Sequence, residues 1–143
     1  MLYTQKTKKA LALCFDAHKN QKDKSGLPYV FHPFHLAEQM TTEEEIVVAL
    51  LHDVVEDTDY TFADLENEGF GDSIIEALKL LTHQPDTDYM EYIRNIKTNP
   101  LATAVKLADL QHNSDVSRLD IVDAKALKRR ELYLQAQAFL QEK

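Results

Sequence analysis

The stretch from residue 43 to residue 57, EEEIVVALLHDVVED, constrains the fold more than any other part of the chain. Its apolar residues follow helical spacing, and at the centre they cover almost the whole circumference of the expected helix. Thr41 or Thr42 is placed to cap the first turn, where three Glu residues meet the positive end of the helix dipole. A helix that is apolar all round is buried, so the remaining chain has to surround it.

The rest of the chain predicts further helices rather than strands. Apolar residues recur at helical spacing, and no segment of useful length alternates as a strand does. The expected helices cover residues 2–19, 33–40, 72–83, 89–97, 100–115 and 123–141. They are separated by stretches that hold Gly, Pro or Asp. A chain of 143 residues is long enough for one self-sufficient core. The sequence therefore predicts an all-α fold, a single helical-bundle domain over residues 1–143.

The charge distribution argues against some partners and locations. The net charge of −8 disfavours a nucleic-acid polymer, which is bound by clustered Lys and Arg. Residues 1–24 nevertheless carry six Lys against two Asp, whereas residues 41–91 carry fifteen acidic residues and one Lys. The acidic part is either a solvated face or a cation site, with the basic part placed to meet the phosphates of a small substrate. The apolar stretches are too short for a signal peptide or a membrane span, so we expect a cytoplasmic protein that contacts no membrane.

Imidazoles and carboxylates follow directly after the buried helix. His52 and Asp53 stand at its end, and Glu56 and Asp57 come one helical turn later. Adjacent side chains are ~100° apart around a helix axis, so both members of the first pair can reach one ion near the helix end. The second pair then supplies acid–base groups beside a water molecule. An HD dipeptide also arises by chance, in which case these acids are ordinary surface residues.

Two other segments offer further ligands. VKLADLQHN places Asp109 and Asn113 on one face of a largely apolar helix. A carboxylate buried there needs a partner, which is a cation, Lys106 or Arg94. Taken alone, His32 in PYVFHP is an ordinary loop or cap residue.

Together the three segments offer a set of metal ligands without sulfur. The set is His32, His52, Asp53 and Asp109. Two imidazoles and two carboxylates suit Mn²⁺ or Fe²⁺ better than a closed structural Zn²⁺ site, and they leave coordination positions for water and substrate. The ligand types alone leave the metal open among Mn²⁺, Fe²⁺ and Zn²⁺.

Three strings of the sequence resemble one family in the same order along the chain. They are SGLPYVFHP, HDVVEDT and VKLADLQHN. The pattern is similar to that of the HD-domain metal phosphohydrolases, in particular the hydrolase domain of the RelA/SpoT alarmone enzymes and the stand-alone small alarmone hydrolases, which include the metazoan SpoT homologue. The resemblance spans residues 7 to about 119.

The resemblance implies an all-α HD-domain bundle that removes the 3′-pyrophosphate from (p)ppGpp. It implies one Mn²⁺ ion held by His32, His52, Asp53 and Asp109. It implies that Glu56 and Asp57 are the catalytic acids, which activate the attacking water and handle the proton of the leaving group.

The resemblance also implies substrate contacts. Asn113 is expected to contact the nucleotide, and the loop at Ser25 and Gly26 to lie near the base. Lys24 is a further candidate in the same loop. Lys106 is a candidate for a phosphate contact, which a salt bridge to the acidic part of the chain would explain equally well.

Two positions depart from the family pattern. Asp23 and Leu110 stand where the alarmone hydrolases commonly have Arg. Neither is a metal or catalytic position, so the departures concern the substrate. The alternatives are therefore another phosphorylated nucleotide, such as NADPH or a nucleoside monophosphate, and an HD-type module that binds a nucleotide without turnover.

Three further features are open at the sequence level. The last helix carries a stripe of Leu127, Leu134 and Ala138, which serves either the core of a monomer or a homodimer contact. His112 is predicted to face away from Asp109 and to have a structural role. Tyr29 is expected to pack beside the loop.

Overall fold

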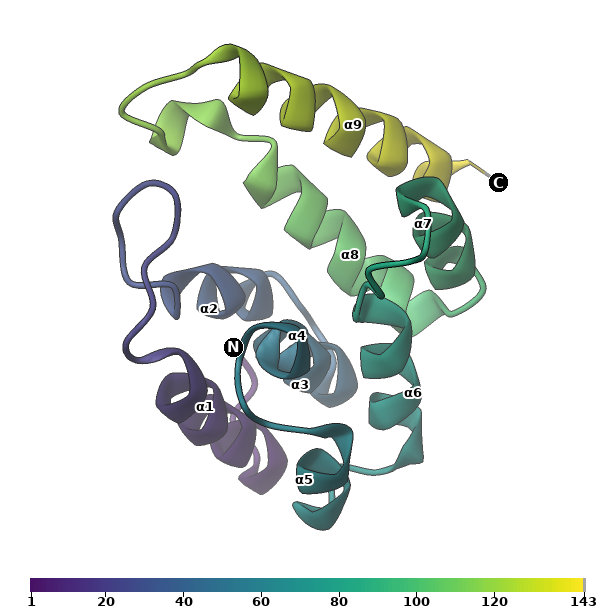
Figure 1. Cartoon of the computed structure of the whole chain (residues 1–143). Coiled ribbons are helices and arrows are strands. Elements are labelled where there is room, and N and C mark those ends of the chain that lie inside the picture. The colour runs from purple at the N-terminus through teal and green to yellow at the C-terminus, as the bar shows by residue number, and fades with distance from the viewer. Residues whose placement is uncertain (143) are drawn as a thin grey trace.

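The computed structural model describes residues 1–142, which are mostly helical (Figure 1). The helices are α1 (Gln5–His18), α2 (Phe31–Glu38), α3 (Glu43–Leu51), α4 (Val54–Asp57), α5 (Phe62–Asn67), α6 (Asp72–Leu81), α7 (Tyr89–Lys97), α8 (Pro100–Asn113), the 3-10 turn η1 (Val116–Arg118) and α9 (Ala124–Gln141). Within the described range the only β pairing is a single bridge between Lys22 and Pro28, in the loop between α1 and α2. The prediction of an all-α fold is confirmed.

Helix α3 lies at the centre of the molecule. Its residues from Ile46 to Leu51 are all buried, and α1, α2, α6 and α8 pack around it (Figure 1). The hydroxyl of Thr42 accepts a hydrogen bond from the Glu45 N–H at 3.2 Å, and the Glu45 carboxylate accepts one from the Thr42 N–H at 3.1 Å. These reciprocal bonds satisfy two free donors of the first turn. The prediction of a buried, capped helix is confirmed.

The prediction of a continuous helix over residues 43–57 is wrong at one point. Helix α3 ends at Leu51 and α4 begins at Val54, so the HD pair forms a break between them. Asp53 has φ −107° and ψ 2°, in the sparsely populated bridge region. The His52 ring turns back onto its own helix, where Nδ1 lies 2.6 Å from the carbonyl oxygen of Ala49. The buried helix therefore stops at the residues that the sequence marks for chemistry.

Two short elements lie outside the predicted helices. Helix α5 begins after Thr61, whose hydroxyl accepts a hydrogen bond from the Asp64 N–H at 3.1 Å. The Asp64 carboxylate in turn accepts one from the Thr61 N–H at 2.8 Å. This Thr-x-x-Asp pair is a variant of the capping box and could have been read from the sequence. The turn η1 follows α8 and starts the connection to α9.

Helices α8 and α9 run side by side in opposite directions (Figure 1). Pro100 occupies the first position of α8, after the capping residue Asn99. The stripe on α9 does not serve the core, since Leu127 is 52% exposed and Leu134 is 40% exposed. Across residues 1–142, no helix combines the length and the apolar character needed to cross a bilayer.

Candidate metal centre

Three helices bring two histidines and an aspartate into contact. His32 lies in the first turn of α2, His52 at the end of α3 and Asp109 on the last half of α8, and all three are buried. Nε2 of His32 lies 2.9 Å from Oδ1 of Asp109, and Nε2 of His52 lies 3.5 Å from the same oxygen. Potential ligand atoms of the three side chains all lie within 4.8 Å of one another.

Asp53 joins this group from the helix break. Its Oδ2 lies 3.0 Å from Nε2 of His52 and accepts a hydrogen bond from the Tyr29 hydroxyl. Oxygens of Asp53, Glu56 and Asp57 form a second group within 4.8 Å of one another. The structure thus brings the four predicted metal ligands together and places the two predicted catalytic acids beside them. Tyr29, which was expected only to pack, also orients Asp53.

The hydrogen bonds of the two histidines suit a cation at their Nε2 atoms. When Nδ1 of His52 donates to the Ala49 carbonyl, Nε2 of the neutral ring carries a lone pair. This buried Nε2 has no hydrogen-bond partner among the described residues, although carboxylate oxygens of Asp53 and Asp109 lie close by. Burial acts to lower the pKa of His52, but the charges of Asp53 and Asp109 outweigh it and raise the pKa well above its usual value. The arrangement therefore favours a positive charge at Nε2, which either a proton or a metal ion can supply. The donor set therefore fits a metal ion.

His112 contacts the Nδ1 side of the His32 ring, so the prediction that His112 faces away from Asp109 is wrong. The two Nδ1 atoms lie 2.7 Å apart, and the two rings stack with centroids 5.0 Å apart. Burial and the nearby charge of Arg118 lower the pKa of His112 to about 4. A neutral His112 can accept a hydrogen bond at its Nδ1 from the Nδ1–H of His32, a tautomer that leaves a lone pair on Nε2 of His32 for a metal. A tertiary contact of this kind has no signal in the spacing of the sequence.

Asp109 also contacts two residues that were predicted to bind substrate. Nζ of Lys106 lies 2.8 Å from its Oδ2, and the Asn113 amide donates to its Oδ1 at 2.9 Å. Burial acts to raise the pKa of Asp109, but the charge of Lys106 and the bonds from His32 and His52 outweigh it and hold the pKa well below its usual range. Lys106, rather than Arg94, is therefore the partner that the buried carboxylate requires.

Lys106→Met is expected to lower the free energy of unfolding by about 3 kcal/mol, since it leaves a buried carboxylate without its cation. Lys106 lies above the Tyr92 ring, with Nζ 5.2 Å from the centroid, and has little contact with solvent. Urea unfolding in the absence of metal measures the change. Lys79→Met, at an exposed position of α6, is the matched control and should change stability by less than ~0.5 kcal/mol. An equal effect of both substitutions would contradict the role of Lys106.

Glu56 and Asp57 hold protons more tightly than ordinary carboxylic acids. Partial burial and the negative charge of Asp53 raise the pKa of Glu56, against an opposing hydrogen bond from the backbone N–H of His83 at 2.7 Å. Partial burial and the charges of Asp53 and Glu56 raise the pKa of Asp57 to about 6. A carboxyl group that titrates close to neutrality can both take and give a proton.

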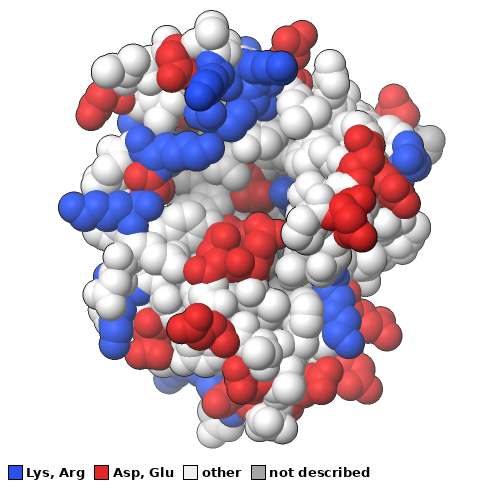
Figure 2. Space-filling model, in the orientation of Figure 1, with Lys and Arg blue, Asp and Glu red and all other residues white. Residues whose placement is uncertain are grey.

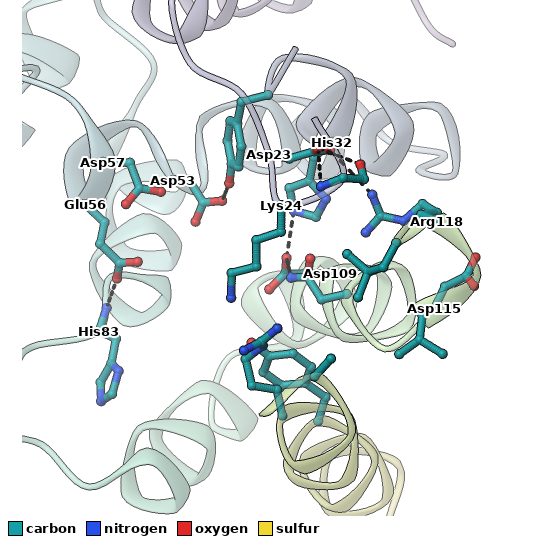
Figure 3. A pocket seen from close by; sticks show the side chains of 18 of the residues that line it. Asp23, Lys24, His32, Asp53, Glu56, Asp57, His83, Asp109, Asp115 and Arg118 are labelled. Carbon is teal, nitrogen blue, oxygen red and sulfur yellow. Dashed lines mark hydrogen bonds and ion pairs between the residues drawn. The ribbon is translucent and has the colours of Figure 1, made fainter. Parts of the chain in front are cut away.

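These residues line one cavity of about 480 Å³, which is within the range that small-molecule ligands occupy. Figure 2 shows a hollow with acidic side chains on its floor and basic side chains along the edge formed by α9. In Figure 3, Glu56 and Asp57 lie on one side of the cavity and Asp23 and Arg118 on the other. The predicted substrate contacts also line it; they are Lys24, Ser25, Lys106 and Asn113.

Comparison with known proteins gives relatives in sequence. No protein-family model matches the chain. A guanosine-3′,5′-bis(diphosphate) 3′-pyrophosphohydrolase of Aquifex aeolicus is 34% identical over 107 residues, which cover 71% of this chain and 15% of that protein. The bifunctional (p)ppGpp synthase/hydrolase SpoT of Escherichia coli is 39% identical over 79 residues, which cover 52% of this chain and 11% of SpoT. The chain thus corresponds to a small part of these much longer proteins.

A solved structure shares the fold over almost the whole chain. It is that of a metazoan ortholog of SpoT described as hydrolysing ppGpp, with a TM-score of 0.77 and 24% sequence identity. The match covers 98% of this chain and 87% of that one. The prediction of a RelA/SpoT hydrolase-like domain is confirmed by the sequence relatives together with this fold.

Proposed function

We propose that the protein is a metal-dependent (p)ppGpp 3′-pyrophosphohydrolase. The observation that carries the proposal is the meeting of two buried imidazoles and two carboxylates beside a cavity that is lined by His32, Asp53 and Asp109 and also by Glu56 and Asp57. The names of the sequence relatives, which include (p)ppGpp hydrolases, support the same substrate. We extend the proposal to one domain over residues 1–143 that acts in the cytoplasm on a small phosphorylated nucleotide, as a monomer or a homodimer.

The proposed metal is Mn²⁺, held by His32, His52, Asp53 and Asp109. When bound, it would supply the positive charge that polarises a phosphoryl oxygen and eases deprotonation of a water molecule. The ligand atoms are nitrogen and oxygen only, which favours Mn²⁺ or Fe²⁺, and metal analysis of the purified protein distinguishes these from Zn²⁺.

The residues beside the metal ligands handle the protons of the reaction. Water attacks the phosphorus bound to O3′ of the ribose, the bond between that phosphorus and O3′ breaks, and pyrophosphate and a 3′-hydroxyl form. Asp57, with a pKa of about 6, is ionised at neutral pH and takes a proton from the attacking water. Glu56, whose pKa is also raised, is the second acid–base group, and it assists transfer of a proton to O3′ as that oxygen leaves. The hydrogen bond from the His83 N–H fixes the position of the Glu56 carboxyl group.

Hydrolysis of ppGpp with added Mn²⁺ tests the proposal. We expect pyrophosphate and GDP as products in equal amounts, and loss of activity when EDTA removes the metal. Release of orthophosphate instead would show that the bond to O3′ is not the one that is cleaved, and a panel with NADPH and nucleoside monophosphates would then identify the preferred substrate class. Binding of ppGpp without any product would instead support a nucleotide-binding module, and the proposal would be wrong.

A further inference from the structure

The loop between α1 and α2 is built around the carboxylate of Asp23. Its Oδ1 accepts hydrogen bonds from the Ser25 N–H at 2.9 Å, the Ser25 hydroxyl at 2.6 Å and the Leu27 N–H at 3.0 Å. These bonds occupy one oxygen and fix the orientation of the other. Oδ2 lies 3.5 Å from Nη1 of Arg118 and is otherwise without a protein partner in the described chain. Asp23 therefore holds the loop with one oxygen and presents the second to the cavity that it lines.

Arg118 reaches the same wall from the opposite end of the sequence. It lies in η1, between α8 and α9, and its Nη2 donates to the carbonyl oxygen of His112 at 3.1 Å. A guanidinium group has five N–H donors, and the contacts to His112 and Asp23 use only part of them. The side chain is 26% exposed and lines the cavity. Donors of Arg118 are therefore available to a bound molecule.

The two side chains keep opposite charges at neutral pH. Burial acts to raise the pKa of Asp23, but the hydrogen bonds from Ser25 and Leu27 and the charge of Arg118 outweigh it, so that the pKa lies below its usual value. The wall thus offers a carboxylate acceptor immediately beside guanidinium donors. Figure 3 shows this pair on the side of the cavity away from Glu56 and Asp57.

We propose that Asp23 and Arg118 together recognise the guanine base of the substrate, and we call this pair of residues the guanine reader. This inference rests on the proposed function, because a nucleotide whose 3′-pyrophosphate lies at the metal ligands extends its base away from the catalytic acids. The Watson–Crick edge of guanine has two adjacent donors, N1–H and N2–H₂, which a carboxylate oxygen can accept. Its O6 and N7 are acceptors, for which an Arg fork is the usual protein partner. One base therefore matches both members of the pair.

Adenine does not match the same pair. It carries an N6–H₂ donor where guanine has O6, so that a donor would face the donors of Arg118. Its N1 is an acceptor, which would face the carboxylate of Asp23. A good bidentate contact is worth ~1–3 kcal/mol of discrimination, which corresponds to a preference of ~5- to 150-fold. The pair is thus expected to select guanine over adenine without taking part in the chemistry.

The test compares matched guanine and adenine nucleotides. For ppGpp and its adenine analogue ppApp, kcat/KM of the wild-type protein should favour guanine by ~10-fold or more. Asp23→Asn keeps an oxygen for the loop but removes the charge, and Arg118→Lys keeps the charge but removes the fork. Each variant should lose most of the preference through KM for ppGpp, while kcat changes little. Arg130→Gln, at an exposed position of α9 outside the cavity, is the control and should retain the preference.

Calorimetric binding of GDP and ADP to the same proteins separates this proposal from the proposed function. A guanine preference in binding that both variants lose supports the reader, even if no nucleotide is hydrolysed and the proposed function fails. Hydrolysis of both substrates with equal efficiency would overturn the reader while leaving the hydrolase intact. Equal binding of GDP and ADP, or a preference that both variants retain, would also overturn it.

Discussion

Asp53→Ala is expected to abolish Mn²⁺ binding and to lower kcat by about a thousandfold or more. The charge that a catalytic metal supplies stabilises the transition state by several kcal/mol, and each 1.36 kcal/mol is a factor of ~10 in rate. Of the proposed ligands, Asp53 is the suitable one to remove, because its side chain is 18% exposed, whereas that of Asp109 is 7% exposed and pairs with Lys106. Metal content after dialysis and the steady-state rate with ppGpp measure the two effects.

Asp59→Ala is the matched control for this substitution. Asp59 is exposed, lies just after α4 and does not line the cavity, so its removal should change neither metal content nor rate. An Asp53→Ala protein that retains one Mn²⁺ per chain and the wild-type rate would show that Asp53 is not a ligand. Loss of metal from both variants would mean that the effect arises from net charge alone.

Asp57→Asn is expected to lower kcat by ~10²- to 10⁴-fold while metal binding is retained, because it removes a proposed acid–base group but none of the proposed metal ligands. The same change should make the folded protein more stable at pH 7. The pKa of Asp57 is raised from 3.8 to about 6 in the folded protein, so folding favours its protonated form. The stability that this group contributes is present below pH 3.8 and is lost as the pH rises through about 6. Since the side chain is half exposed, we expect a gain of only ~1 kcal/mol at pH 7 from the uncharged amide.

Urea unfolding at pH 4 and pH 7, together with rates in excess Mn²⁺, tests this prediction. The gain in stability should be present at pH 7 and nearly absent at pH 4, where the wild-type side chain is already protonated. Asp59→Asn, at the exposed position after α4, should change neither quantity. A variant with the wild-type kcat would remove Asp57 from the mechanism. A loss of stability at pH 7 would show that the carboxylate has a favourable partner in the folded protein.

The sequence predicted the parts of the site that depend on local pattern. The all-round apolar character of residues 46–51 is enough to place α3 in the core, and the histidine and acids directly after it mark the position of the site. The helix break at His52 and Asp53 was not predictable, since it depends on a ring that binds back to Ala49 and on a neighbouring Tyr29.

Contacts between distant segments were the main omission. The structural role predicted for His112 agrees with its contact to His32, but the partners of His112 and Arg118 were missed because these contacts arise only when α8 and η1 meet α2 and the α1–α2 loop. Asp23 was visible as a departure from the family pattern, but the sequence alone did not show that Arg118 lies opposite it. Helical spacing predicts which face a side chain occupies on its own helix, and the partner on another helix follows from the packing of the whole chain.

The position of the proposed metal ligands on α2, α3 and α8 has a consequence for folding. A metal ion that binds His32, His52 and Asp109 joins segments that are 77 residues apart, and so acts as a reversible crosslink within the chain. Ligands that bind only the folded state add a free energy of RT ln(1 + [L]/Kd), or ~2.7 kcal/mol at a hundredfold excess over Kd. The melting temperature of this protein should therefore rise with the concentration of free metal, and starvation for that metal would reduce the amount of folded protein as well as its activity.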